Sequence, residues 1–194
     1  MRYTAEHKER TRSRILREAS TSLRRGGPDG VVVADIMAGA GLTHGGFYVH
    51  FKSKDDLIVN AIADAVSEVN DRFDAIVDGR TPASSLAAYI DAYLSQQHRE
   101  HRDHGCPIAA LAGDVPRLSD EAREAFQTGT ATIARRIAVW LEALGKDNPD
   151  ELAGSVLAEL VGALVLARAM ADPRESRRIL KTSRAALRSR LGID

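Results

Sequence analysis

The sequence has little cysteine, few aromatic residues and no long hydrophobic run. Its 194 residues include one cysteine, one tryptophan, four tyrosines and four phenylalanines. A single cysteine excludes a disulfide within the chain, and this fits a reducing cytoplasm. The longest apolar segment, residues 160–171, contains Arg168 and is shorter than the ~18 residues that a membrane span requires. We therefore expect a cytoplasmic protein without a membrane-spanning segment.

The sequence also lacks a net charge, but its charges are unevenly distributed. Lysine plus arginine and aspartate plus glutamate number 27 each. Residues 1–54 contain 10 basic and 5 acidic residues, a net charge of +5, so the remaining 140 residues carry −5. A basic segment attached to an acidic remainder suggests that only the first binds a polyanion. Chance variation in surface charge is the alternative.

No segment has the pattern of a convincing strand, since VVV at 31–33 is too short. Helical periodicity runs through the chain and is interrupted by turn formers such as GGPDG, DGRTP and GKDNPD. The pattern predicts an all-α fold, with a three-helix N-terminal head and a larger helical body. We expect about nine helices, near residues 6–25, 33–40, 43–51, 53–76, 83–103, 106–114, 119–145, 149–171 and 174–191.

The segment VADIMAGAGLTHGGFYVHF, residues 33–51, predicts two short helices joined by a tight turn. Gly41 stands where the left-handed end of a helix is favoured, and Thr43 is suited to cap the helix that follows. Two helices joined in this way match a helix-turn-helix, whose second helix enters the major groove of DNA. The apolar side of the second helix is expected to carry Phe47, Val49 and Phe51.

Two adjacent glycines, Gly45 and Gly46, fall in the first turn of this second helix. Each glycine costs up to ~1 kcal/mol relative to alanine within a helix, so a pair indicates a competing requirement. Close approach of the backbone to DNA is such a requirement, while a plain turn or a phosphate cradle are the alternatives. His44 and Tyr48 would then be the exposed side chains that reach a base or a phosphate, although Tyr48 fits a core position equally well.

Basic residues around the motif predict contacts to DNA phosphates that do not depend on sequence. They lie in the first predicted helix and at the start of the fourth, where Lys54 would also fit an ordinary solvated position. The residues concerned are Lys8, Arg10, Arg12, Arg14 and Lys54.

The segment RILREASTSLRRGGPDGVVVADIMAGAGLTHGGFYVHFKSKDDL resembles the N-terminal domain of bacterial transcriptional regulators of the TetR/AcrR type. GCPIAALAGDV at 105–115 is similar to the body of one branch of that family. The resemblance implies a DNA-binding domain at 1–53 and a regulatory and dimerisation domain at 54–194. Val32 departs from the pattern, because many members carry threonine there as a helix cap and phosphate contact. The residues that match the DNA-facing pattern are Thr43, His44, Gly45, Gly46, Tyr48, His50 and Lys54.

The same resemblance implies a homodimer that binds a near-palindromic operator, most often as a repressor. A small-molecule effector, or oxidation, would release it from the DNA. A dimer must hold its heads so that they meet half-sites ~34–36 Å apart, and small residues in the last two predicted helices allow close helix packing. An intrachain core is the alternative for this region. The predicted interface residues are Leu157, Leu160, Gly162, Leu164 and Ala167.

An effector pocket is expected between helices of the body, with mostly apolar walls. Each candidate for its lining fits a plain core position as well. The candidates are Phe73, Tyr89, Tyr93, Cys106, Ile108, Leu111, Phe126 and Trp140.

Cys106 follows three histidines and lies near a predicted helix N-terminus, where a thiolate is favoured. It therefore suggests a redox or electrophile sensor, with a small buried residue as the alternative. His98, His101 and His104 with this thiol also suggest zinc, but His104 rotates away from the other two on a helix. We therefore expect no metal and no cofactor.

Two rival functions are an enzyme acting on a phosphorylated substrate and a helical small-molecule-binding or adaptor protein that does not bind DNA. The sequence contains no glycine-rich phosphate loop after a strand, no HExxH and no nucleophile elbow. We therefore predict a ligand-responsive transcriptional regulator that is not an enzyme.

Overall fold

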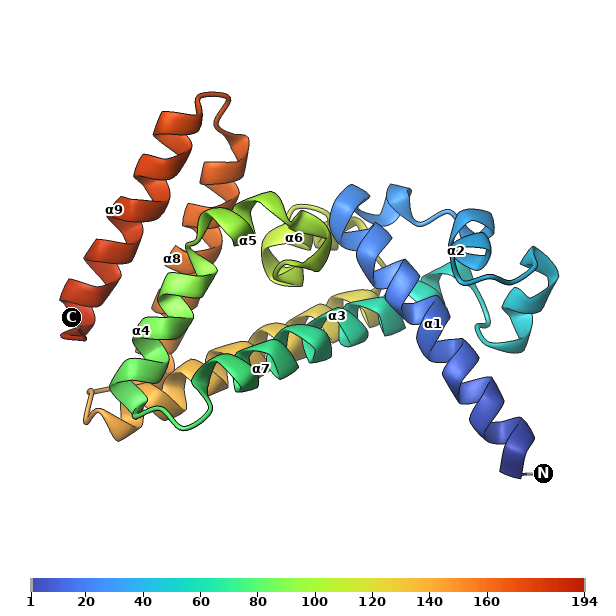
Figure 1. Cartoon of the computed structure of the whole chain (residues 1–194), viewed down its shortest axis with the longest axis horizontal. Helices are drawn as coiled ribbons and strands as arrows, with labels where there is room; N and C mark the ends of the chain where they lie inside the picture. Colours follow the sequence, from blue (N-terminus) through green and yellow to red (C-terminus); the bar gives the residue numbers. More distant parts are fainter. Residues whose placement is uncertain (1, 194) are drawn as a thin grey trace.

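The computed structural model describes residues 2–193, which form only helices and connecting loops (Figure 1). This confirms the all-α prediction. Met1 and Asp194, the end residues of the two predicted domains, lie outside the described part. The elements are α1 (Arg2–Gly26), η1 (Pro28–Gly30), α2 (Val33–Gly39), η2 (His44–Val49), α3 (Lys54–Val77), α4 (Pro82–Tyr93), α5 (Gln96–Glu100), η3 (Arg102–His104), α6 (Pro107–Leu111), η4 (Val115–Arg117), α7 (Asp120–Ala143), α8 (Pro149–Ala169) and α9 (Pro173–Leu191), where η denotes a 3-10 helix.

Capping residues start several helices at the positions that the sequence predicts. The Ser53 hydroxyl accepts a hydrogen bond from the Asp56 amide at 3.0 Å and so begins α3. Two aspartates in the first turn of α3 interact favourably with the helix dipole. Pro82 occupies the first turn of α4, where its missing N–H costs no hydrogen bond.

Two predicted helices are shorter than expected. The helix predicted at 83–103 is wrong, because α4 ends at Tyr93 and α5 begins only at Gln96. The Ser95 hydroxyl accepts a hydrogen bond from the His98 amide at 3.1 Å, and this local cap starts a new helix. The helix predicted at 106–114 is limited to α6, which a short 3-10 segment follows.

The core has two parts, one in the head and one in the body, and α3 contributes to both. Figure 1 shows α3 and α7 running side by side from the body towards the head. The head core includes Leu57 and Ile62 on α3, together with Leu111 and Ala122 from the body. The division after residue 53 remains a prediction, since side chains on both sides of it share this core.

α8 is a long apolar helix that ends two residues before the predicted 149–171, and its apolar stretch is longer than the segment 160–171 that the sequence suggested. By length and hydropathy alone it is able to cross a membrane, the one such helix among the described residues. The core helix of a soluble protein passes the same test. Here α8 lies against α7 and α9 and fills the body core with Val156, Leu160 and Leu164.

Candidate functional site

The turn between α2 and the recognition segment (His44–Val49) has the geometry that its glycine predicts. Gly41 has a φ of 69°, and the Leu42 amide donates to the Met37 carbonyl at 2.8 Å, which closes the end of α2. The recognition segment itself is a 3-10 helix of six residues. Thr43 lies at its N-cap position, but its side chain makes no capping hydrogen bond, so that predicted role is wrong.

The recognition segment and Phe51, which follows it, turn two aromatic rings inward, and two residues of the segment point outward. Phe47 and Phe51 are each 2% exposed, and their ring centroids lie 5.8 Å apart. Tyr48 is 72% exposed and Val49 is 61% exposed. The predicted inward position of Val49 is therefore wrong, because a residue two positions from a buried ring points away from the core. Tyr48 is available for contact with a partner.

Nothing within the chain requires glycine at the two positions of the recognition segment. A Cβ atom on Gly45 would meet no atom within 4 Å, and one on Gly46 would lie at an ordinary 3.6 Å from Met37. Neither glycine has a positive φ, unlike Gly41. Neither packing nor backbone conformation within the chain explains the pair.

Three predicted contact residues lie around this segment on the exposed surface of the head. Thr43, His44 and Lys54 are all exposed, and so is Lys52, which sequence reasoning missed. Lys52 was missed because its position follows no helix periodicity.

The arginines of α1 have different surroundings. Arg10 is exposed and lies 3.9 Å from Glu6, a weak pairing that leaves it free to contact phosphate. Arg14 is exposed but donates a hydrogen bond to the Ala40 carbonyl at the end of α2. Arg12 donates to Asn60 at 2.7 Å, so it connects α1 to α3.

His50 is half-buried at the end of the recognition segment. Its Nδ1 atom is buried without a hydrogen-bond partner among the described residues. Burial lowers the pKa of His50, and the nearby Lys8 and Arg12 lower it further. His50 is therefore less accessible than His44 and Tyr48, which are both exposed.

Val32 precedes α2 and is 47% exposed. A valine side chain cannot accept a hydrogen bond from the helix amides, so the first amides of α2 have no side-chain cap. The phosphate contact that a threonine would add at this position is therefore missing.

The body has a partly open cavity of about 420 Å³ between α3, α4, α5 and the segment up to Cys106. Three of the eight predicted pocket residues, Phe73, Tyr93 and Cys106, line it. The other five belong to packed cores, as with Tyr89, whose ring packs 5.5 Å from that of Trp140. The five predicted residues that do not line it are Tyr89, Ile108, Leu111, Phe126 and Trp140.

Cys106 lies just before the five-residue helix α6 and is 1% exposed. Burial raises the pKa of its thiol, and hydrogen bonding from its surroundings, including Tyr93, offsets this only in part. The thiol is therefore protonated at neutral pH. The predicted reactive thiolate is wrong, and the alternative of a small buried residue applies.

His98 has both ring nitrogens engaged beside the cavity. Its Nδ1 donates to the Tyr93 carbonyl at 2.7 Å, and its Nε2 accepts from the Cys106 amide at 2.9 Å. Burial lowers the pKa of His98 to about 4, so the ring is neutral at physiological pH. Neither nitrogen is available to a metal, and residues 2–193 contain no cluster of three or more His, Cys, Asp or Glu arranged for one.

Four of the five predicted interface residues lie inside the chain's own core. Leu160, Leu164 and Ala167 are completely buried, and Leu157 is 4% exposed. Their predicted place in a subunit interface is therefore wrong, and Gly162 alone of the five is partly exposed. The exposed side of α8 carries Gly154, Ala158, Val165 and Leu166 instead.

An exposed helix-turn-helix segment on a basic head, joined to a helical body with a cavity, defines a helix-turn-helix DNA-binding regulator. Residues 15–61 match the family of bacterial regulatory proteins described as the tetR family. Residues 82–182, more than half of the chain, match the C-terminal domain of LmrA/YxaF-like transcriptional regulators. The chain therefore belongs to the TetR family of transcriptional regulators. Members of this family are DNA-binding transcriptional regulators.

Individual relatives agree with this assignment. The chain is 26% identical to YfiR, an uncharacterised HTH-type regulator of Bacillus subtilis, over 54% of this chain and 51% of YfiR. It is 30% identical to the HTH-type transcriptional repressor KstR2 of Mycolicibacterium smegmatis, over 56% and 52%. The chain thus spans about half the length of each. The reduced form of E. coli NemR has the same fold, with a TM-score of 0.80 at 20% identity over 92% of this chain and 95% of NemR.

Proposed function

We propose that the protein is a homodimeric transcriptional repressor that binds a near-palindromic operator and is released by a small-molecule effector. The observation that carries this proposal is the pair Gly45 and Gly46, for which the chain itself has no structural need. Without side chains there, the recognition segment lies close to the floor of the major groove. The exposed side chains of Thr43, His44 and Tyr48 then reach base edges and the adjacent phosphates.

Phosphate contacts flank the recognition segment on two sides. Lys52 and Lys54 lie at the start of α3, and Arg10 lies on α1. These cations displace counterions from the DNA and position the head without reading sequence. Arg14 acts indirectly in this proposal, because its bond to Ala40 fixes the end of α2.

The exposed side of α8 is the proposed dimer surface. Gly154 and Gly162 have no atoms within 4 Å of a Cβ position, so a second helix is able to approach closely there. Val165 is 42% exposed and Leu166 is 55% exposed, which supplies apolar area for burial between two copies. A dimer formed here doubles the DNA contacts and matches the symmetry of a palindromic operator.

The cavity of the body is the proposed effector site. Its lining combines apolar side chains of α3 and α4 with a few polar groups, as small-molecule sites do. Cys106 contributes to its wall as a neutral thiol, so the proposed effector binds without covalent reaction.

The direct experiment is footprinting of the DNA upstream of the protein's own gene. We expect a protected, near-palindromic site with half-site centres ~34–36 Å apart. A protein that binds no duplex DNA there, or binds all duplexes equally, is instead the helical adaptor considered as a rival.

A further inference from the structure

The cavity of the body has a permanent cation and, within residues 2–193, no carboxylate in its lining. Arg72, His101 and His104 contribute to its lining, and none of the described residues that line it is an aspartate or a glutamate. The rest of the lining is largely apolar. The apolar lining residues are Val69, Phe73, Ile76, Ala92 and Tyr93. A molecule with an apolar ring or chain and one anionic group is complementary to both parts.

Arg72 is the permanent cation of this lining and is loosely held. Its guanidinium lies 3.2 Å from the Glu68 carboxylate, and its Nε lies 3.5 Å from the Glu68 carbonyl. The two side chains are 46% and 39% exposed, so their attraction is weak. The guanidinium is therefore able to exchange Glu68 for the anionic group of a ligand, at little cost.

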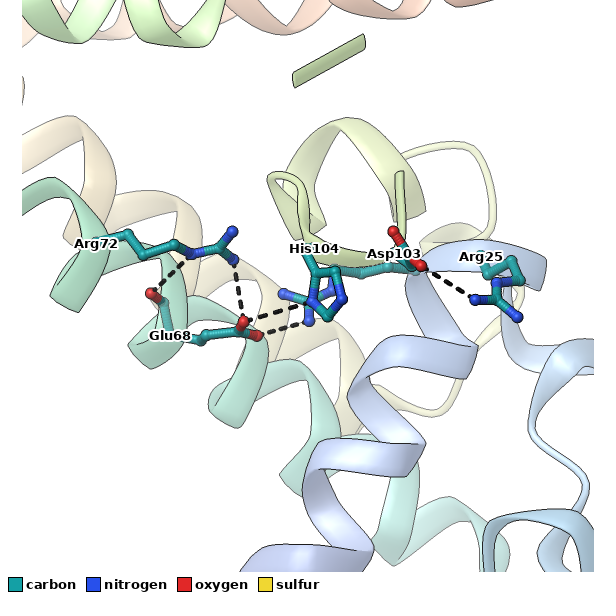
Figure 2. Close-up of polar contacts among 6 residues, drawn as sticks. Arg25, Glu68, Arg72, Asp103 and His104 are labelled. Atoms are coloured by element: carbon teal, nitrogen blue, oxygen red, sulfur yellow. Dashed lines mark hydrogen bonds and ion pairs between the residues drawn. The ribbon is translucent and has the colours of Figure 1, made fainter. Parts of the chain in front are cut away.

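Glu68 lies between the cavity and the head. Figure 2 shows it between Arg72 on one side and His104 on the other, whose Nδ1 is 3.7 Å from the carboxylate. The same carboxylate accepts a hydrogen bond of 2.6 Å from Arg24 of α1. Glu68 therefore contacts two residues that line the cavity and one buried residue of the head.

The end of α1 is attached to two elements that line the cavity. Arg24 binds Glu68 on α3, and the next residue, Arg25, binds Asp103 in η3 at 3.0 Å (Figure 2). Since α3 and η3 both contribute to the lining, a ligand bound there would contact both elements to which α1 is anchored. A change at these anchors reorients α1 together with the head that it carries.

We propose that this cavity binds an amphipathic anion through Arg72, and that Glu68 transmits its binding to Arg24 in the head. The inference rests on the proposed function, since it names the chemistry of the effector and its route to the DNA-binding segment. The anionic group replaces the Glu68 carboxylate at Arg72, and its apolar part packs against Phe73 and Tyr93. Glu68, no longer paired with Arg72, changes its contact with Arg24.

The first test compares two fluorescent probes that differ in one charge. 8-Anilinonaphthalene-1-sulfonate is anionic, and N-phenyl-1-naphthylamine has the same rings without the sulfonate. In the full-length protein, Arg72→Gln should lower the affinity for the anionic probe about tenfold. The affinity for the neutral probe should change by less than about twofold. Arg80→Gln is the matched control, because Arg80 is exposed just beyond α3 and does not line the cavity. Equal losses for both probes, or an equal loss in the control, overturn the assignment.

The second test separates binding from transmission. Glu68→Gln removes the competing carboxylate, so the anionic probe should bind about threefold more tightly. In the same variant the probe should no longer release the protein from its operator. Arg24→Gln breaks the same contact from the head side and replaces this variant if Glu68→Gln does not fold. Release that persists in either folded variant overturns the role of Glu68.

The two proposals fail in different ways. If the wild-type protein binds no operator, the proposed function is wrong, and the Arg72 comparison still decides the ligand chemistry. If it binds its operator but Arg72→Gln changes the affinity of neither probe, the repressor proposal stands and the inference about the cavity is wrong.

Discussion

The buried guanidinium of Arg24 donates a hydrogen bond of 2.6 Å to the carboxylate of Glu68, which lies 44 positions further along the chain. Arg24 is 1% exposed, and its Nε and Nη1 atoms have no partner among the described residues. Glu68 therefore provides the main compensation for a charge that water does not reach. This contact adds a buried charged link to the apolar packing and the Arg12–Asn60 hydrogen bond that already join the first helix of the head to α3.

Removing Glu68 should destabilise the protein more than removing Arg72. We expect Glu68→Ala to lower the free energy of unfolding by about 2 kcal/mol, because it leaves the Arg24 charge buried and unpaired. Arg72→Ala, which breaks only the exposed pair, should cost about 0.5 kcal/mol or less. Urea denaturation followed by circular dichroism measures both. Equal costs for the two variants would show that Arg24 does not depend on Glu68.

The glycines of the recognition segment lead to a second prediction. Gly45→Leu should fold normally, since no atom lies within 4 Å of its Cβ position, yet lose at least about tenfold in operator affinity. Gly46→Leu should also abolish binding with the dimer intact, although its Cβ would contact Met37. Gly113→Leu is the control, because a Cβ at Gly113 likewise meets nothing within 4 Å. Fluorescence anisotropy of labelled operator DNA measures the affinities, and unchanged binding by Gly45→Leu contradicts close approach.

The neutral ring of His98 predicts a loss of stability in acid. Its pKa is about 4 in the folded protein and 6.5 unperturbed, so between these values the unfolded chain takes up a proton that the folded chain does not. The contribution of His98 to the free energy of unfolding is fully present above about pH 6.5. It decreases by about 3 kcal/mol as the pH falls to 4. Urea denaturation across this range should show a steeper loss for the wild type than for His98→Gln. Equal slopes would mean that His98 is not held neutral.

The dimer surface on α8 gives a fourth prediction. Leu166→Glu should convert the protein to a monomer and weaken operator binding, because it places a charge in an apolar interface. Ala75→Glu, an exposed substitution on α3, should leave the dimer intact. Analytical ultracentrifugation measures both. A dimer that persists in Leu166→Glu would require a different interface.

Local signals in the sequence predicted much of the head. Gly41, Ser53 and Pro82 act on their own neighbours, so the ends of α2 and the starts of α3 and α4 follow from short-range rules. The outward position of Val49 follows from the same short-range rules, because residues two positions apart do not share one face of a helix, and the predicted inward position overlooked this.

Long-range packing set the features that the sequence did not reveal. α8 is apolar on nearly every side, so its pattern could not show which residues face the core and which are exposed. Cys106 is buried in the body core that includes residues of α4 and α8, and its place before α6 does not reveal this. The pairing of Arg24 with Glu68 likewise joins residues whose separation carries no periodic signal.

The central claim is that the basic head binds operator DNA, and the salt dependence of binding tests it most directly. We expect specific binding whose affinity falls about a thousandfold or more between about 50 mM and 200 mM salt, as the release of several counterions requires. A non-cognate duplex should bind far more weakly at every salt concentration. Affinity that is insensitive to salt, or no binding to the DNA upstream of the gene, would contradict the account.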